Sequence, residues 1–189
     1  MKYIKFLALL MLVFYLPLTL KSQDSTSVHD LFYKKQQQSL SLLSGWSVGN
    51  IIYSPLATKN LFSPEKTNEH FHQMNFSWNL LNIGIAGLGH IIVNKDSKKP
   101  WDMKTLYDKK KKAEKSIIIN LGLDLAYMAT GLLLKNNTQN NNSEYSMNKG
   151  YGNSLILQGG YLLFYDAIFL MKLKKILIKK KVNKVGVNK

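Results

Sequence analysis

The chain has 189 residues, a formal net charge of +15, 46% hydrophobic residues and no cysteine. The absence of cysteine excludes disulfide scaffolds, thiolate metal sites and thiol nucleophiles. All 26 basic residues are lysine, and because arginine is the usual reader of guanine edges and paired phosphate oxygens, this composition argues against nucleic-acid binding. The apolar residues form five blocks separated by lysines, so the mean hydropathy of -0.14 averages two unlike populations.

The first 22 residues have the order of a secretory signal peptide. Residues 1–5 are basic, residues 6–20 are apolar, and the small residue Ser22 precedes a polar stretch. We therefore expect a signal peptide over residues 1–22, with cleavage after Ser22. Because Leu20 occupies the position where a small residue is usual, an uncleaved anchor is the alternative. A polar N-terminal segment follows at residues 23–39.

Four further apolar blocks follow, each close to the roughly 20 residues that an α-helix needs to cross a bilayer. None of them contains lysine or glutamate. The first is the weakest, because Ser44, Ser47, Asn50 and Ser54 dilute it and Pro55 interrupts its last turn. The sequence predicts an all-α fold, a membrane-embedded four-helix bundle over residues 40–171, with spans at 40–58, 74–93, 116–134 and 153–171. A basic tail over residues 172–189 completes the chain.

The distribution of lysines indicates a topology and a conflict. With four spans, residues 23–39, 94–115 and 172–189 lie on one face with 19 lysines, against four on the other face. The positive-inside rule places the lysine-rich face in the cytoplasm, whereas a cleaved signal peptide delivers residue 23 to the outside. Three alternatives would remove the conflict. Residues 40–58 lie in the interface or re-enter without crossing, the lysine excess reflects a compositional bias and the rule is violated, or the first 20 residues do not direct the chain across the membrane. The orientation stays open.

Polar and small residues of each block fall on one helical face at about 100° per residue. Because an unpaired polar group in hydrocarbon costs several kcal/mol, we expect these faces to point into the bundle. The four faces comprise Leu42, Trp46, Gly49, Asn50 and Tyr53; His72, Asn75, Asn79, Asn82, Ala86, Gly89 and His90; Asn120, Asp124, Tyr127 and Gly131; and Tyr151, Ser154, Gln158, Tyr165 and Asp166. Glycines in the blocks would let helices approach closely: Gly45, Gly49, Gly84, Gly87, Gly89, Gly122, Gly131, Gly159 and Gly160.

The helical rise and the alternating direction of the helices place the polar residues in three layers. From the lysine-poor face to the lysine-rich face, the layers contain Tyr53, Asn79 and Gln158; Asn50, Asn82, Asp124 and Tyr127; and Trp46, His90, Asn120 and Asp166. Matching heights on neighbouring helices favour a polar interior.

Asp124 and Asp166 are the candidates for chemistry. A carboxylate near the midplane could carry a proton, with His90 as a relay and Asn82 or Tyr127 as orienting partners. The alternative is that the acids accept hydrogen bonds and only hold the helices together, which is a common role. The candidate intramembrane polar or proton site comprises Asp124, Asp166, His90, Asn79, Asn82, Asn120, Tyr127, Gln158 and Asn50. We predict no catalytic residue, metal ligand or cofactor.

Two other groups of residues have simpler interpretations. His70 and His72 do not share a helical face, so they are better read as interfacial residues than as metal ligands. The four consecutive lysines at 109–112 and the lysines of the tail favour binding to anionic lipid headgroups over nucleic acid, because the tail lysines are interleaved with Ile176, Leu177, Ile178 and Val182. The expected partners are the lipid bilayer, anionic headgroups, and a second copy of the chain or another membrane protein.

Four stretches carry a family resemblance: GWSVGN at 45–50, FHQMNFSWNLLNIGIAG at 71–87, NLGLDLAY at 120–127 and GYGNSLILQGGYLLFYD at 150–166. They resemble an uncharacterised family of small bacterial integral-membrane proteins, a domain of unknown function with an N-terminal signal. The resemblance covers about residues 40 to 171 and implies no activity.

We therefore expect a multi-pass protein of the bacterial inner membrane that is a structural or assembly component and not an enzyme. The second hypothesis is a small proton-coupled carrier or sensor using Asp124, Asp166 and His90. A membrane enzyme is third, because no residue pair matches a nucleophile with its base.

Overall fold

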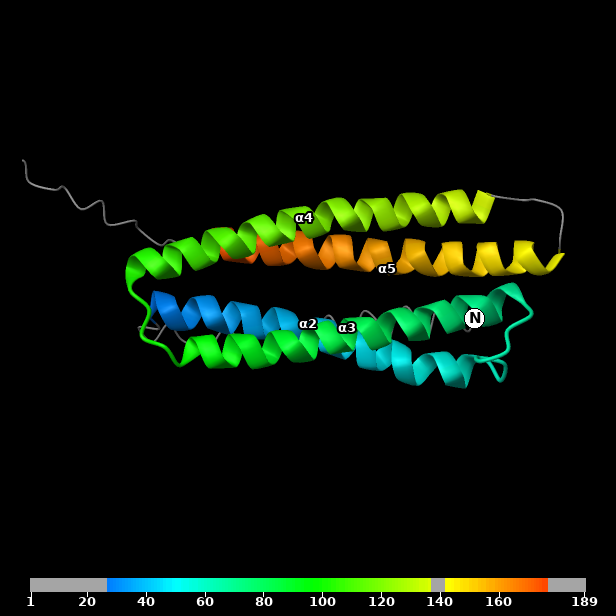
Figure 1. Cartoon of the computed structure of the whole chain (residues 1–189), viewed down its shortest axis with the longest axis horizontal. Coiled ribbons are helices and arrows are strands. Elements are labelled where there is room, and N and C mark those ends of the chain that lie inside the picture. The colour runs from blue at the N-terminus through cyan, green and yellow to red at the C-terminus, as the bar shows by residue number, and fades with distance from the viewer. Residues whose placement is uncertain (1–26, 137–141, 177–189) are drawn as a thin grey trace, which may run out of the picture.

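Four long helices form almost all of the part of the chain that the computed structural model describes, residues 27–136 and 142–176 (Figure 1). The all-α, four-helix prediction is confirmed, and the described residues contain no strand. The predicted signal peptide and residues 177–189 of the basic tail lie outside the described residues. The helices are α2 (Val28–Ala57), α3 (Thr67–Ser97), α4 (Met103–Asn136) and α5 (Asn142–Lys174).

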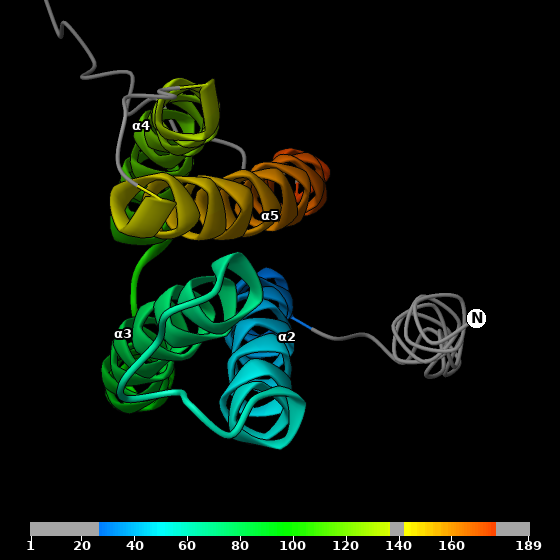
Figure 2. The same ribbon diagram turned by 90° about the vertical axis from the view of Figure 1, so that its right-hand side faces the viewer.

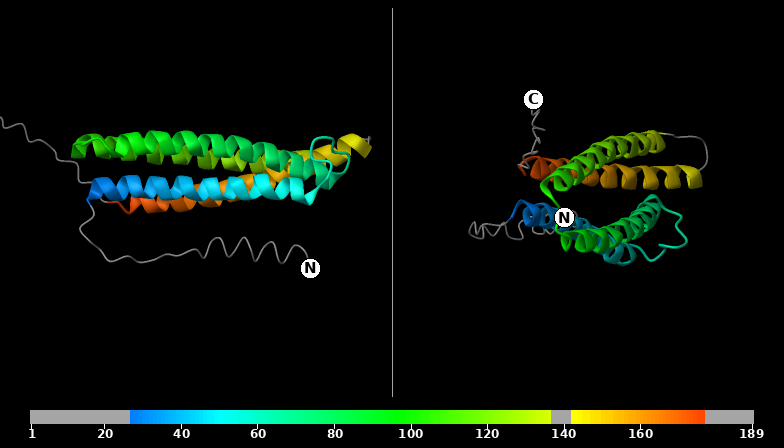
Figure 3. Two further views of the ribbon diagram at one scale, coloured as in Figure 1. Left: turned by 90° about the horizontal axis from the view of Figure 1, so that it is seen from below. Right: turned by 60° about the vertical axis from the view of Figure 1, so that its left-hand side comes forward.

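The helices associate as two antiparallel pairs. α2 packs along α3 and α4 packs along α5, and the contact between α3 and α5 joins the pairs (Figure 2). Because each helix runs opposite to the one before it, the start of α2, the α3–α4 connection and the end of α5 lie at the same end of the bundle (Figure 3). This is the lysine-rich end. The lysine-rich segments 94–115 and 172–176 thus lie at the same end as the start of α2, as expected if successive helices run in opposite directions.

Each helix extends beyond the apolar block that predicted it at one end or both. α2 begins inside the segment assigned as a polar N-terminal segment, where the Ser27 hydroxyl accepts a hydrogen bond from the Asp30 N–H at 3.1 Å. Before α4, the Asp102 carboxylate accepts the Thr105 N–H at 2.6 Å, and this bond lowers the pKa of Asp102 below its usual value. The starts of α2 and α4 are thus marked by caps in polar sequence outside the apolar blocks.

Pro55 does not interrupt α2 as expected. The helix continues to Ala57, with Pro55 inside it. A proline removes one hydrogen bond to the preceding turn. Because only two helical residues follow Pro55, the loss affects the last turn alone, and the helix keeps its earlier bonds.

Three helices are long and apolar enough to cross a membrane: Thr67–Ser97, Met103–Asn136 and Glu144–Lys174. α2, which contains the block identified as the weakest, is not among them. The outward surface is strongly apolar, since large hydrophobic side chains on α3 and α4 are about half exposed or more, among them Leu81, Ile85, Leu88, Ile92, Ile118, Leu125 and Leu133. Soluble proteins rarely expose contiguous apolar surface of this extent. The surface and the helices are compatible with a membrane protein.

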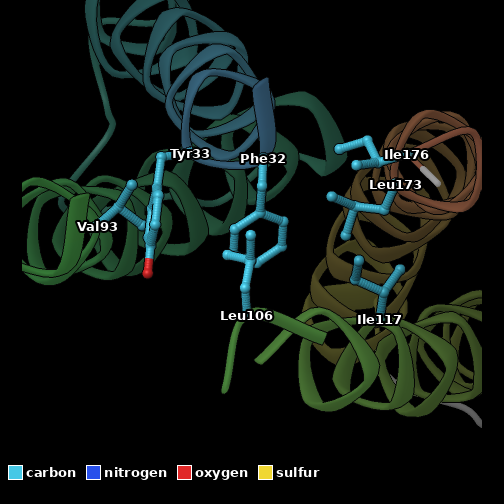
Figure 4. Close-up of a cluster of buried hydrophobic side chains, with 7 residues drawn as sticks. All are labelled: Phe32, Tyr33, Val93, Leu106, Ile117, Leu173 and Ile176. Carbon is cyan, nitrogen blue, oxygen red and sulfur yellow. The ribbon is translucent and has the colours of Figure 1, made fainter. Parts of the chain in front are cut away.

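An apolar cluster joins all four helices at the lysine-rich end (Figure 4). Phe32 and Leu106 are its most enclosed members from α2 and α4, and Leu173 of α5 is also fully buried. The remaining members are Tyr33, Val93, Ile117 and Ile176. This cluster fixes the end of the bundle where the two pairs meet, and the polar interior begins beyond it.

Two glycines bring α4 and α5 into backbone contact. A Cβ atom on Gly131 would lie 2.6 Å from the Gly152 carbonyl oxygen, and one on Gly152 would lie 2.5 Å from the Gly131 carbonyl oxygen. No side chain fits at either position without separating the helices. Gly159 also approaches α4 closely. The prediction that glycines mark close approaches between helices is wrong for six others, because an added Cβ would have nothing within 4 Å: Gly45, Gly49, Gly84, Gly87, Gly122 and Gly160.

Candidate functional site

Four side chains and one carbonyl form a closed ring of hydrogen bonds between α2, α3 and α5. The Trp46 indole N–H donates to Gln158 Oε1 at 3.0 Å, and the Gln158 amide donates to Asn75 Oδ1. The Asn75 amide donates to Asn50 Oδ1 at 2.6 Å, and the Asn50 amide returns to the Trp46 carbonyl at 2.8 Å. The three amide side chains each donate once and accept once inside this ring. The ring therefore ties three helices together through polar groups.

The ring is closed off from the outside of the bundle. Gln158 is 0% exposed, Asn75 2% and Asn50 6%. Asn79, one turn after Asn75, is also fully buried and donates to the Asn75 carbonyl at 2.7 Å. Because buried amides without partners are unfavourable, the ring makes one register of the three helices much better than its neighbours.

Aromatic side chains extend the contact between α2 and α5 on the side of the lysine-rich end. The rings of Trp46 and Tyr161 stack with centroids 3.8 Å apart, and Ser39 donates to the Tyr165 hydroxyl at 2.7 Å. Towards the opposite end, Tyr151 of α5 donates to Gln73 of α3 at 2.6 Å. Polar bonds between α5 and its neighbours thus span much of its length.

The two candidate carboxyls belong to a different group on α4 and α5. Asp124 is 3% exposed and Asp166 is 6% exposed. Asp166 interacts electrostatically with Asp124 and through a side-chain hydrogen bond with Asn120. The sequence placed Asp166 and Asn120 in one layer, and the structure confirms their contact. The acids are neighbours, so one site can use both.

His90 is not part of this acid pair. Its Nδ1 lies 2.5 Å from Gln37 Oε1, so the ring is held against α2. None of the hydrogen bonds found in the described part of the chain joins His90 to either acid. The relay role that the sequence suggested for His90 therefore receives no geometric support.

A cleft of about 420 Å³ separates the α2–α3 pair from the α4–α5 pair beside the acids. Its walls are mainly apolar. Five predicted site residues line it: Asn82, Asn120, Asp124, Tyr127 and Asp166. Asn120 is exposed, because it lies in the open part of the cleft and not in the packed interior. The Trp78 and Tyr127 rings meet edge to face across the cleft, with centroids 4.8 Å apart.

The predicted inward faces are confirmed for most residues and wrong for a few. Buried polar residues of α3 and α5 coincide with the predicted faces, including Asn79, Asn82 and Gln158. The face of α2 is rotated by about one residue, since Leu43, Ser47, Asn50 and Ser54 are buried, whereas Tyr53 and Gly49 are exposed. Asn120 is the exception on α4.

The layers were only partly correct. Asn50 was placed with Asp124, but the structure joins it to Asn75 and Gln158. The predicted heights depend on the helical rise and the alternating direction of the helices, which do not determine how far one helix is shifted along another. Long amide side chains also reach between layers that the backbone rise would separate.

Asn75 is the residue that sequence reasoning missed. It lies on the predicted face of α3 but was not among the candidate site residues, although it bonds two other helices. Nothing in the sequence distinguishes it from Asn79 and Asn82, because its partners depend on how α2 and α5 are registered against α3. Ser47 and Ser54 of α2 are buried although they lie off the predicted face of that helix, whereas the burial of Ser154 confirms its predicted place on the inward face of α5.

His70 and His72 lie near the start of α3 and are buried. Their rings face Tyr151 and Tyr53 respectively, with centroids 5.5 and 5.6 Å apart. In the described part of the chain, no group of three or more His, Asp or Glu residues could hold a metal ion. The two histidines therefore belong to separate aromatic contacts.

Comparison with known families places this architecture in context. The chain belongs to a family of unknown function, DUF6992, whose model matches residues 42–167. The match covers the amide ring, the acid pair and most of the residues that line the cleft. No curated protein and no solved structure matches the chain.

The ring makes a prediction about coupled stability. Asn75→Leu and Gln158→Leu should each lower the free energy of unfolding by about 1 to 3 kcal/mol, because each leaves buried partners unpaired. The double variant should lose less than the sum, since the second change removes a group that the first had orphaned. Thermal unfolding of the purified protein measures these losses. Ser77→Leu, at an exposed position on α3, is the matched control, and additive losses for the pair would contradict the ring.

Proposed function

We propose that this member of the DUF6992 family is a non-enzymatic structural or assembly component of the bacterial inner membrane. The observation that supports it is the closed amide ring, in which buried polar groups bond to one another and fix helix positions. Side chains used in this way hold a shape. The apolar outer surface, which would face lipid or another membrane protein, fits the same role.

We further propose that α3, α4 and α5 cross the membrane with the lysine-rich end in the cytoplasm, and that α2, which is not apolar enough to be recognised as a span by itself, crosses packed along α3. Lysines of the α3–α4 connection gather there, and Lys109 and Lys99 lie over the Trp101 ring at 4.3 and 5.2 Å. Tryptophan and lysine are typical of the membrane interface. The only described acids that pair with these lysines are Asp96 and Glu114. The excess positive charge suits anionic lipid headgroups as partners.

A small proton-coupled carrier or sensor is the second candidate function. It is favoured by the neighbouring carboxyls of Asp124 and Asp166, which line an open cleft with Asn120. Intramembrane acids are a recurrent feature of proton pathways. The pairing of His90 with Gln37 means that a pathway would begin from the two acids alone.

A flux measurement distinguishes the two candidates. The protein reconstituted into vesicles should not speed the decay of an imposed pH gradient beyond that of empty vesicles. Asp124→Asn combined with Asp166→Asn should leave its assembly and its cellular phenotype intact, because amides retain hydrogen bonding. A gradient that collapses with the wild-type protein, and not with the double variant, would establish the carrier and end the structural proposal.

Labelling of single cysteines tests the orientation, and the natural absence of cysteine leaves one thiol per variant. In intact cells, an impermeant maleimide should label Ser63→Cys in the α2–α3 connection and should not label Lys98→Cys until the membrane is opened. Both positions are exposed, so access depends on the side of the membrane. Replacing Lys109, Lys110, Lys111 and Lys112 with Gln should give a mixed orientation. The opposite labelling pattern would refute the proposed topology.

A further inference from the structure

Three buried polar atoms around the cleft have no hydrogen-bond partner among the described residues. They are Oδ2 of Asp124, Nδ2 of Asn82 and Nε1 of Trp78. Asp124 is 3% exposed and Asn82 is 5% exposed, and all three residues line the same cleft. Buried polar groups in folded proteins are nearly always paired. Six other buried side-chain atoms of the described residues also lack a partner, but none of their residues lines this cleft. The three atoms that share the cleft therefore indicate an occupant.

The three atoms specify the polar end of that occupant. The amide of Asn82 and the indole of Trp78 donate hydrogen bonds, and the carboxylate of Asp124 accepts them. A hydroxyl group can donate to the acid and accept from the two N–H groups at once. An ammonium group would leave both donors unpaired. A carboxylate or phosphate would lie beside the acids Asp124 and Asp166, and no lysine or histidine of the described chain lines the cleft.

The walls of the cleft specify the rest of the occupant. They are built mainly from leucine, isoleucine and aromatic side chains of all four helices. Leu81 and Ile85 of α3 and Leu123 of α4 line the cleft while remaining 58%, 54% and 46% exposed. The cleft therefore opens between α3 and α4, which make little direct contact with each other. An apolar chain can enter there from the surface that we assign to lipid.

We propose that this cleft binds an uncharged membrane amphiphile with an apolar chain and a hydroxyl at its polar end, of the long-chain alcohol class. The hydroxyl lies between Asp124, Asn82 and Trp78, and the chain passes out between α3 and α4. The cleft volume of about 420 Å³ is within the range of ligand-binding sites. This inference rests on the proposed membrane location and gives the structural component a specific lipid partner.

Photocrosslinking in phosphatidylcholine nanodiscs tests the proposal. The probe is dodecanol with a diazirine in mid-chain, and the crosslinked residues are mapped by mass spectrometry. Labelling should concentrate on cleft residues such as Leu81, Ile85 and Leu123. Unlabelled dodecanol should compete for it, and equal amounts of dodecane or dodecanoic acid should not. Asn82→Leu should reduce cleft labelling about fivefold, as expected for one lost hydrogen bond.

Two further variants separate binding from folding. Leu123→Trp fills the exposed mouth without removing a buried group, and it should abolish cleft labelling. Thr130→Val removes a polar group from an exposed position on α4 outside the cleft, and it should leave labelling unchanged. Uniform labelling of the outer surface, or equal competition by the acid, would overturn the binding proposal while the membrane proposal stands. A protein that remains in solution without lipid or detergent would overturn both.

Discussion

The structure depends on one constraint: polar side chains on apolar helices must find partners away from lipid. Asn50, Asn75 and Gln158 satisfy it by bonding to one another and to Trp46, so that no amide of the ring faces outward. In the membrane location that we propose, there is no water to replace a missing partner, so an incorrect register would be more costly than in a soluble bundle. Between membrane-embedded helices, association comes from such bonds and from close packing.

Different helix pairs are held together by different kinds of contact, close backbone packing in some places and polar side-chain bonds in others. α4 and α5 approach through Gly131 and Gly152, where the backbones themselves touch. α5 also approaches the start of α3 closely, since a Cβ atom on Gly150 would lie 2.5 Å from the Thr67 carbonyl oxygen. Polar side chains bond α5 to α2 and α3, and an apolar cluster joins all four helices at the lysine-rich end. α3 and α4 have neither kind of contact along most of their length. The cleft lies where both kinds of contact are missing, and three of the unpaired buried polar atoms belong to residues that line it.

Much of this arrangement could be predicted from the sequence. The inward face of α3 was recognised because Asn75, Asn79 and Asn82 recur at helical spacing among large apolar residues. The predicted inward face of α2 differs from the observed one by about one residue. Small polar residues occur on several sides of this helix, so their spacing does not define one face, and the predicted face was centred near Trp46. Helix periodicity defines a face within one helix, but it does not define how one helix is shifted along another.

That limit explains which parts of the site could not be predicted. The ring depends on the heights of α2, α3 and α5 relative to one another, so Asn75 could not be identified as its centre from its own neighbours. The cleft depends on the separation of α3 and α4, which results from the packing of other helix pairs. The match to a family of unknown function extends over the ring and most of the cleft lining without assigning them a role.

The most direct test of the inward polar faces is a spin-label scan of α3 in lipid bilayers. Single cysteines placed at each position from 78 to 92 would be compared for collision with oxygen, which dissolves in lipid. We expect oxygen access to rise and fall with the helical period, with maxima at Leu81, Ile85, Leu88 and Ile92 and minima at Asn79, Asn82 and Ala86. Maxima at the asparagines, or equal access around the helix, would contradict a bundle held together by its buried amides.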